Sequence, residues 1–287
     1  MSIKSRELQI GQNNFVWGSR TYLMGVLNVT PDSFSGDGTI DDLQRGVDQA
    51  LRFEDQGADI IDIGGESSRP ASVYKNTRKV NFQQELTRVI PVIEALTGRL
   101  GIPISIDTQK ASVLRSAVTA GAAMANDVSM LRADPEMHST IADLGIPVVI
   151  SHTRHNASYP NGVATEVVED LRQAAKVVEE AGLPLSHVIL DPGIGFGKTT
   201  LQSLEMQRDL SELVTLGYPV LIGTSRKSSI GAVLGGLPPD QRLEGTAATV
   251  ALAIERGADI VRVHDVKEMS RVVKMSDAIV RGWSPKE

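Results

Sequence analysis

A glycine-rich loop follows a short apolar run in the stretch 187–198, which reads HVILDPGIGFGK. The run Val188–Leu190 has the length of a strand buried on both faces, so we expect Asp191 where that strand leaves the core. Glycine at every second position of GIGFG allows sharp turns and a close approach of the backbone to a ligand. Considered alone, the stretch is explained better by a strand-to-helix turn with a capping acid.

Two common phosphate-binding motifs do not match the spacing of this loop. A phosphate loop of the form GxxxxGK[ST] that ends at Lys198 and Thr199 requires a glycine where the chain has Pro192. A dinucleotide fingerprint that starts at Gly193 requires its third glycine where the chain has Lys198. The glycines therefore serve a purpose other than these two motifs.

Polar or charged side chains end the other apolar runs of the chain as well. The residues at these positions are Asn28, Asp62, Asp107, Asn126, His152, Asp191, Lys227, Arg262 and His264. Simpler explanations exist, because Asp107 and Asn126 also fit helix caps and His152 fits a hydrogen-bonded wall residue better than a catalyst. Their recurrence at one end of successive runs predicts a shared site.

Two binding surfaces are predicted at this site. The first is an acidic pocket formed by Asp107, Asn126 and Asp191, whose acceptors suit the N–H groups of a flat, nitrogen-rich ring. The second is a rim rich in hydrogen-bond donors that suits phosphate oxygens, and its members are Ser68, Arg69, Arg262 and His264. Asn28 is able to hold a magnesium ion beside that rim.

The elements that must position these residues follow one repeated pattern of apolar run, loop and helical segment. The runs are Tyr22–Leu27, Asp59–Ile63, Pro103–Ile106, Ala122–Ala125, Pro147–Ile150, Val188–Leu190, Pro219–Ile222 and Asp259–Val263. Apolar residues recur at helical spacing between them, for example at Val167, Leu171 and Ala175. Glycines that end helices are expected just before five of the runs, at Gly57, Gly101, Gly121, Gly145 and Gly257.

Eight such units predict a closed (β/α)8 TIM barrel of class α/β, since an open doubly wound sheet more often stops at five or six strands. Residues 7–17 alternate apolar and polar about a turn, which predicts a short N-terminal hairpin within an extension over residues 1–20. Because no linker interrupts the repeats, we expect one domain over residues 1–287.

The composition narrows the possible functions. The net charge of -6 argues against nucleic acid as the main partner. The absence of cysteine excludes disulfides, zinc-thiolate sites and thiol nucleophiles. The sequence also contains no HExxH motif, which argues against a zinc hydrolase. No apolar stretch has the ~20 residues needed to span a bilayer or resembles a signal segment, so a cytoplasmic protein with no membrane partner is expected.

The motifs together resemble the dihydropteroate synthase family over nearly the whole chain. They are MGVLNVTPDSFSGDG (24–38), DIIDIGGESSRP (59–70), ISIDT (104–108), NDVS (126–129), DPGIGFGK (191–198), GTSRKSSIG (223–231) and RVHDV (262–266). This resemblance implies a transferase of folate synthesis with a (β/α)8 barrel. Such an enzyme joins 6-hydroxymethyl-7,8-dihydropterin diphosphate to 4-aminobenzoate, releases pyrophosphate and uses Mg²⁺.

The resemblance also implies roles for individual positions. The implied pterin pocket is Asp107, Asn126, Asp191 and Lys227; the diphosphate site is Asn28, Ser68, Arg69, Arg262 and His264; and the 4-aminobenzoate site is Phe34, Pro70, Phe196 and Ser228. Catalysis by an SN1-like path would rest on Asp107, Asp191, Lys227 and Arg69, with the metal near Asn28. The family is usually a homodimer.

The chain departs from the family pattern most clearly at residues 151–162, which read SHTRHNASYPNG, and only His152 carries over there. Two other functions share part of the pattern. A corrinoid-linked methyltetrahydrofolate methyltransferase uses a similar pterin pocket, and a catalytically silent pterin-binding protein needs only that pocket. Neither makes use of the cations near Arg69 and Lys227, so the synthase reaction is favoured.

Overall fold

Eight parallel strands form a barrel at the centre of the chain. The computed structural model describes residues 7–30, 40–66 and 80–284. The barrel strands are β3 (Tyr22–Asn28), β4 (Ile60–Gly64), β5 (Ile104–Asp107), β6 (Met124–Asp127), β7 (Val148–Ser151), β8 (Val188–Asp191), β9 (Leu221–Ile222) and β10 (Ile260–Val263). Their order is β8-β7-β6-β5-β4-β3-β10-β9, and a parallel bridge between Leu190 and Val220 joins the two ends. The predicted barrel is confirmed, and the open sheet is excluded.

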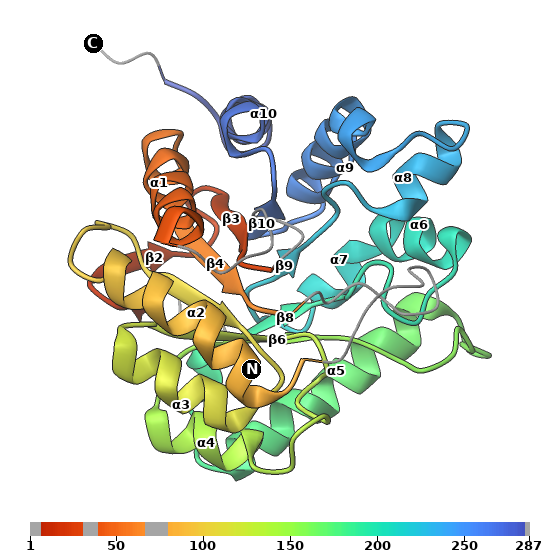
Figure 1. Cartoon of the computed structure of the whole chain (residues 1–287). Helices are drawn as coiled ribbons and strands as arrows, with labels where there is room; N and C mark the ends of the chain where they lie inside the picture. Colours follow the sequence, from red (N-terminus) through yellow and green to blue (C-terminus); the bar gives the residue numbers. More distant parts are fainter. Residues whose placement is uncertain (1–6, 31–39, 67–79, 285–287) are drawn as a thin grey trace.

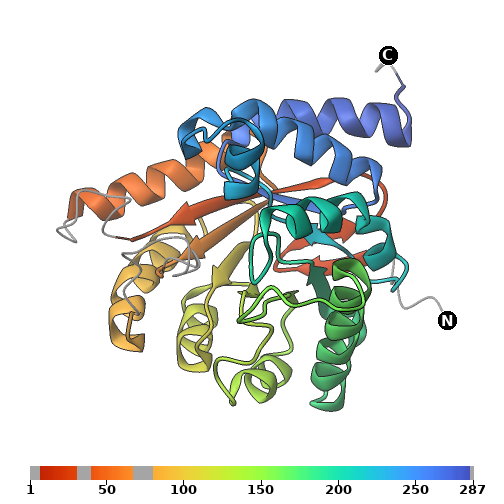
Figure 2. The same ribbon diagram turned by 90° about the vertical axis from the view of Figure 1, so that its right-hand side faces the viewer.

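Helices surround the strands on the outside (Figures 1 and 2). They are α1 (Ile40–Asp55), α2 (Phe82–Leu96), α3 (Ala111–Ala120), α4 (Met137–Leu144), α5 (Val163–Glu180), α6 (Thr200–Arg208), α7 (Leu210–Val214), α8 (Ser228–Val233), α9 (Leu243–Glu255) and α10 (Val266–Arg281), with short 3₁₀ turns at Leu185–His187 and Pro239–Gln241. Helix α5 illustrates why they dock, because Val167, Leu171 and Val178 are buried on one face of it. The helical spacing predicted at Val167, Leu171 and Ala175 is therefore confirmed in α5.

The predicted helix-ending glycines are mostly correct. Gly57, Gly121, Gly145 and Gly257 all have positive φ, a conformation that glycine adopts without steric cost. The prediction is wrong for Gly101, which does not have a positive φ. Helix α2 ends at Leu96, and the turn after it places Gly98 in the positive-φ conformation instead.

The interior of the barrel changes from apolar to polar along its axis. A buried apolar layer at the start of the strands includes Met24, Ile60, Met124, Val149, Ile189, Leu221 and Ile260. Because side chains on a strand alternate between two faces, the residue two positions later also points inward. On five of these strands that residue is Asp62, Asn126, Ser151, Asp191 or Arg262. The polar layer therefore lies directly above the apolar one, at the carboxyl ends of the strands.

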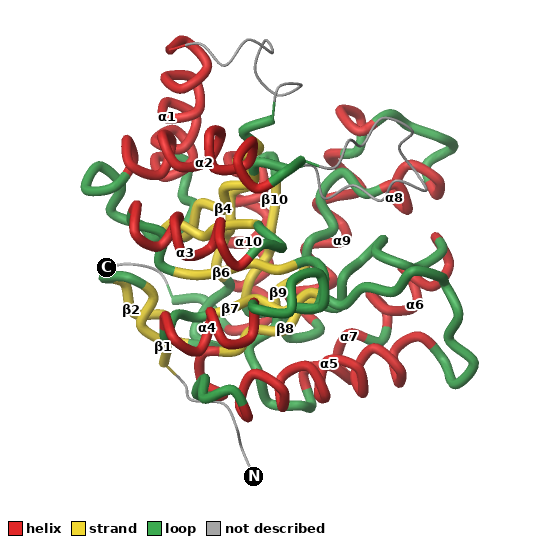
Figure 3. The backbone as a smooth tube through the Cα atoms, turned by 60° about the horizontal axis from the view of Figure 1, so that its bottom comes forward, coloured by secondary structure: helices red, strands yellow, loops and turns green. Residues whose placement is uncertain are grey.

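The N-terminal hairpin closes the opposite end of the barrel. Its strands, β1 (Glu7–Ile10) and β2 (Asn13–Val16), pair antiparallel as predicted. Leu8, Ile10, Phe15 and Trp17 are buried in one cluster with the apolar layer of the barrel. Figure 3 shows the hairpin at one end of the strands, with the helices around their sides. Among the described residues, the hairpin therefore covers the end of the barrel opposite the polar layer.

Candidate active site

An arginine bridges two carboxylates across the polar layer of the barrel. Arg262 on β10 donates from Nε to Asp62 Oδ2 on β4 at 2.6 Å and from Nη2 to Asp107 Oδ2 on β5 at 2.8 Å. Asn126 on β6 donates to the same Asp62 oxygen at 3.0 Å. Burial alone would lower the pKa of Arg262, but Asp62 and Asp107 raise it, so the guanidinium stays charged.

Two oxygens in this layer have no hydrogen-bond partner among the residues that the structure describes. They are Asp62 Oδ1 and Asn126 Oδ1, both buried. Buried polar atoms are normally paired, because an unpaired acceptor loses its hydration without compensation. The two oxygens therefore provide acceptors for N–H donors of a ligand.

The pKa of Asp107 is raised far above its ordinary value. Burial raises its pKa from 3.8 to about 7, and the charges of Asp62, Glu85 and Asp127 add to the shift, while Arg262 opposes it. The helix that follows begins at Ala111 with Lys110 in the capping position, so Asp107 does not cap it. Asp107 is therefore available to a ligand, and a cationic ligand would favour its ionised form.

Asp191 is fixed in place by two hydrogen bonds. Its Oδ2 accepts from Ser151 Oγ at 2.9 Å, and its Oδ1 accepts from the backbone N–H of Gly193 at 2.8 Å. Burial raises its pKa, although these bonds and the nearby Lys227 oppose the shift. The following helix is capped by Thr199, so the capping explanation for Asp191 is wrong. Its carboxylate lies in the polar layer as predicted.

Lys227 and Phe196 lie together at the edge of the site. The ammonium of Lys227 is 4.3 Å from the centroid of the Phe196 ring, a favourable cation–π contact. Burial lowers the pKa of Lys227 to about 8, whereas Asp191 and Asp107 favour its charged form. Ser228, the next residue, is exposed and begins α8. The structure thus brings an aromatic ring, a cation and a hydroxyl-bearing residue together beside Asp191.

Arg226, the neighbour of Lys227, is directed to a different partner. Its backbone has a φ of 58°, which is uncommon for a non-glycine residue. Its guanidinium pairs with both carboxylate oxygens of Asp265. Asp265 therefore neutralises the charge of Arg226. Arg226 and Lys227, although adjacent, do not need a common anion to offset their repulsion.

His264, the last predicted member of the rim, is hydrogen-bonded to Ser225. Its Nδ1 lies 3.0 Å from Ser225 Oγ. Burial, together with Arg262 and Arg226, lowers its pKa to about 3, so the imidazole is neutral near pH 7. It is therefore a hydrogen-bonding group here rather than a cation.

The predicted rim is only partly described. Asn28 is half-buried at the end of β3, paired in register with Gly64 on β4. Arg262, which was predicted for the rim, pairs with Asp62 and Asp107 in the polar layer. Four predicted residues lie outside the described part of the chain: Phe34, Ser68, Arg69 and Pro70.

Sequence reasoning gave no role to several residues of this layer. Asp62 was recognised as a strand end, yet its contacts with Arg262 and Asn126 place it at the centre of the site. Ser151 and Ser225 hold Asp191 and His264. The available signal was spacing, because Asp62 and Ser151 follow inward-facing apolar residues by two positions.

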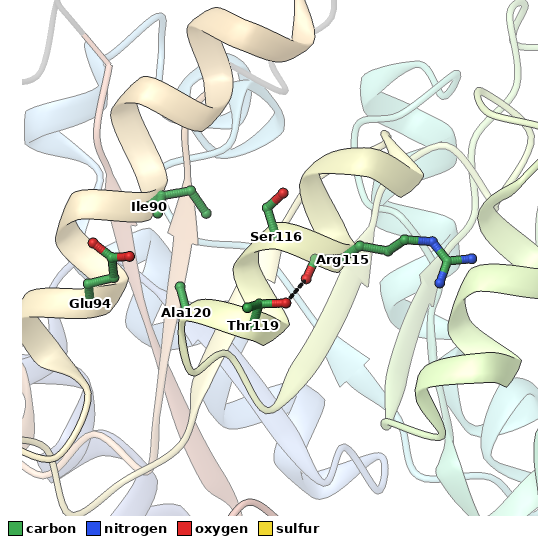
Figure 4. Close-up of a pocket in the computed structure, with 6 residues that line it drawn as sticks. All are labelled: Ile90, Glu94, Arg115, Ser116, Thr119 and Ala120. Carbon is green, nitrogen blue, oxygen red and sulfur yellow. Dashed lines mark hydrogen bonds between the residues drawn. The ribbon is translucent and has the colours of Figure 1, made fainter.

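A hollow on the outer surface is separate from this site. It lies between α2 and α3 and is lined by Ile90, Glu94, Arg115, Ser116, Thr119 and Ala120 (Figure 4). None of the strand-end residues reaches it. Within the described ranges, no three His, Asp or Glu side chains gather as metal ligands, and no helix is long and apolar enough to cross a membrane.

Comparisons with known proteins agree on one family. The family described as pterin binding enzyme matches residues 24–264. The dihydropteroate synthase of Bacillus subtilis is 49% identical over 261 residues, which are 91% of this chain and 89% of that protein. The dihydropteroate synthase of Clostridium beijerinckii is 45% identical over 96% of this chain and 100% of its own length.

Solved structures give the same result. The dihydropteroate synthase of Clostridium difficile, determined in the presence of pteroic acid, has a TM-score of 0.89 and 47% identity, with 93% of this chain and 99% of that chain covered. The Xanthomonas albilineans dihydropteroate synthase with 4-aminobenzoic acid has a TM-score of 0.89 and 41% identity, covering 96% of this chain and 98% of that one.

We expect Asp107→Asn to gain stability relative to the wild type as pH rises. A carboxyl whose folded pKa is about 7, against an ordinary 3.8, makes the folded state lose stability as pH rises through that window. Asparagine carries no such penalty, so the difference in unfolding free energy from urea titrations should be more favourable to the variant at about pH 8 than at about pH 5. Asp143→Asn, at an exposed carboxylate, is the control and should show a smaller change. An Asp107→Asn difference that does not vary with pH would contradict the shifted pKa.

Proposed function

This chain belongs to the pterin binding enzyme family, and we propose how the mouth of its barrel performs the dihydropteroate synthase reaction. That reaction joins 6-hydroxymethyl-7,8-dihydropterin diphosphate to 4-aminobenzoate in folate biosynthesis, forming 7,8-dihydropteroate and pyrophosphate. The unpaired acceptors of the polar layer are the observation that supports the proposal most strongly. Asp62 Oδ1 and Asn126 Oδ1 are buried beside Asp107, where a flat ring with several N–H donors would satisfy them.

The pterin would occupy the pocket of Asp107, Asn126, Asp191 and Lys227. The floor beneath it is apolar and closed by the hairpin, so the ring lies on a dry surface with its polar edges facing the acids. Asp191 is already oriented by Ser151 and Gly193 before any ligand binds. Such preorganised groups stabilise developing charge without a cost of reorganisation during the reaction.

Departure of the diphosphate is the step that these acids assist. The bond between the exocyclic carbon and the bridging oxygen breaks, and its electron pair leaves with pyrophosphate. The remaining CH₂ is conjugated with the pterin ring, so positive charge spreads over it and is stabilised by Asp107 and Asp191. The neutral aromatic amine then attacks that carbon and gives up a proton to solvent. An SN1-like path fits because an arylamine near pH 7 gains little from a general base.

The aromatic amine would bind at the outer edge of the pocket. Phe196 offers a ring face, and Lys227 and Ser228 offer donors for the carboxylate of 4-aminobenzoate. The Xanthomonas albilineans relative was solved with 4-aminobenzoic acid, which supports this assignment by similarity. Phe34 and Pro70 belong to the same proposal from their motifs alone.

We propose that Mg²⁺ binds with the diphosphate near Asn28. A magnesium ion commonly takes one or two protein oxygens, keeps water molecules and completes its shell with substrate phosphates. The single amide oxygen of Asn28 at the barrel mouth fits that donor set, whereas a complete protein cage is not found in the described ranges. The ion supplies charge neutralisation on the leaving group. Ser68, Arg69 and His264 would hold the remaining phosphate oxygens.

We also propose that the chain forms a homodimer through α9 and α10, which pack against each other. Large apolar side chains are exposed on these helices, including Met275 at 62%, Ile279 at 72% and, just beyond α10, Trp283 at 73%. Contiguous exposed apolar surface of this kind commonly marks a protein interface. The face lies outside the barrel, away from the polar layer. The cytoplasmic location stays a prediction.

The decisive assay for the reaction is pyrophosphate release. The wild-type protein should release pyrophosphate only when pterin diphosphate, 4-aminobenzoate and Mg²⁺ are all present, because the leaving group and the nucleophile are both required. Release that does not depend on 4-aminobenzoate would indicate a hydrolase. Pterin binding with no release under any condition would indicate a silent binding protein.

Asp107→Asn should reduce turnover in that assay by ~10²-fold or more, because one preorganised charge would no longer stabilise the cation. Asp143→Asn, an equivalent change on the surface, should leave turnover near that of the wild type. Near-normal turnover of Asp107→Asn would refute the role of that carboxylate.

Ile279→Asp should convert the dimer to a monomer, because a charge would be buried in the interface. Light scattering coupled to size-exclusion chromatography would measure the mass. Val177→Asp, at an exposed apolar residue on α5, is the matched control and should remain dimeric. A monomeric wild type, or a dimer unaffected by Ile279→Asp, would place the interface elsewhere or exclude it.

A further inference from the structure

The ammonium of Lys198 is enclosed by the glycine-rich loop that it ends. Its Nζ lies 2.9 Å from His152 Nδ1, 3.1 Å from the carbonyl oxygen of Gly193 and 3.2 Å from that of Phe196. Burial lowers the pKa of Lys198 to about 7, whereas Asp191 favours its charged form. The charged side chain has three N–H donors, and three acceptors surround it here. Lys198 therefore ties both ends of the segment 193–196 to one point, and that segment carries the Phe196 ring.

His152 connects this point to the wall of the barrel. Its side chain is fully buried, and its Nε2 lies 3.1 Å from Asp170 Oδ2 on α5. Because Asp170 accepts at Nε2 and Lys198 donates to Nδ1, the proton of a neutral imidazole is on Nε2. Burial and the charge of Lys198 lower the pKa of His152 to about 3, in agreement with that neutral form.

Arg154 contacts the same carboxylate oxygen of Asp170 as His152 does. It donates from Nε to Asp170 Oδ2 at 2.9 Å and from Nη1 to Glu166 Oε2 at 2.6 Å. Its guanidinium also lies 4.6 Å from the centroid of the Tyr159 ring, and the Tyr159 hydroxyl donates to the carbonyl of Gly197 at 3.0 Å. The segment 151–162 thus connects the loop to helix α5 through Arg154 and holds Gly197 through Tyr159.

The loop rests directly on the backbone of this segment. A Cβ added at Gly193 would lie 1.8 Å from the carbonyl oxygen of His152, and one added at Gly197 would lie 2.1 Å from that of Arg154. Both glycines also have positive φ. These contacts prevent the loop from moving toward the backbone of residues 152–154. A further constraint on the Phe196 ring is the hydrogen bond from Lys198 to the Phe196 carbonyl oxygen.

We propose that Lys198 is a positioning residue for the aromatic amine substrate, held by His152 and Asp170 and acting through Phe196. The proposal rests on the proposed function, in which Phe196 receives 4-aminobenzoate. Lys198 donates to the loop backbone and to His152, and it reaches the substrate only through the ring that it orients. Loss of its contacts would therefore weaken binding of the amine more than it affects the pterin pocket, where Ser151 still holds Asp191.

Steady-state kinetics with both substrates tests this separation. Lys198→Met keeps most of the buried side chain and removes the three donors. It should raise the KM for 4-aminobenzoate on the order of tenfold while changing the KM for pterin diphosphate by less than about twofold, since small displacements of positioning groups affect the ligand they orient. Lys176→Met, at an exposed lysine on α5, is the matched control and should change neither KM.

Two substitutions of His152 separate the link to Lys198 from the link to Asp170. Asparagine retains an oxygen near the position of Nδ1 and keeps an acceptor for Lys198, whereas glutamine retains an amide nitrogen near Nε2 and keeps a donor for Asp170. Both substitutions remove the buried imidazole ring, so any loss of folding stability from its removal is common to the two variants. His152→Gln should raise the KM for 4-aminobenzoate about as much as Lys198→Met, and His152→Asn should raise it much less.

The outcomes distinguish this inference from the proposed function. A wild-type protein that releases no pyrophosphate would remove both. A working wild type whose Lys198→Met variant keeps its KM for 4-aminobenzoate, or raises both KM values equally, would overturn the positioning role alone. If Lys198→Met does not fold, equal KM values for the two His152 variants would overturn the role by themselves.

Discussion

The contact between Arg262 and the carboxylates of Asp62 and Asp107 is the interaction on which the site depends. It joins β10, β4 and β5 across the interior of the barrel, directly above an apolar layer. Removing one member would leave an uncompensated buried charge, which is far more costly than the net gain from the pair itself. The strands are therefore held in one arrangement by the same groups that face the ligand. Stability and substrate recognition share these side chains.

Burial shapes the chemistry of the surrounding groups in a consistent direction. Burial raises the pKa values of Asp107 and Asp191 and lowers those of Lys227 and His264, so each group is shifted toward its neutral form before a ligand binds. A positively charged transition state reverses this tendency for the acids. In the proposed reaction, the ionised acids would therefore match the charge of the transition state better than they match the empty pocket.

The fold was predictable because its signal is local. Each barrel strand is a short apolar run followed by a loop and a segment of helical spacing. This pattern can be recognised from neighbouring residues in the sequence, without information on distant contacts. The polar strand ends were also visible, since Asp107, Asn126 and Asp191 follow buried runs directly. The pairings were not, because Arg262 and Asp62 are 200 positions apart and only closure of the barrel brings them together. The neutral state of His264 and the turn at Arg226 likewise arise from tertiary surroundings that no short motif records.

The hairpin at the closed end of the barrel affects how ligands bind and dissociate. Within the described ranges, Leu8, Ile10, Phe15 and Trp17 close that end, so ligands would reach the polar layer from the opposite end. The acids that would receive the heterocycle are strand residues, whereas Phe196 lies in a loop farther out. If both ligands bound as proposed, the outer one would block the exit of the inner one until it dissociated. The barrel would then impose an order in which the two ligands bind and dissociate.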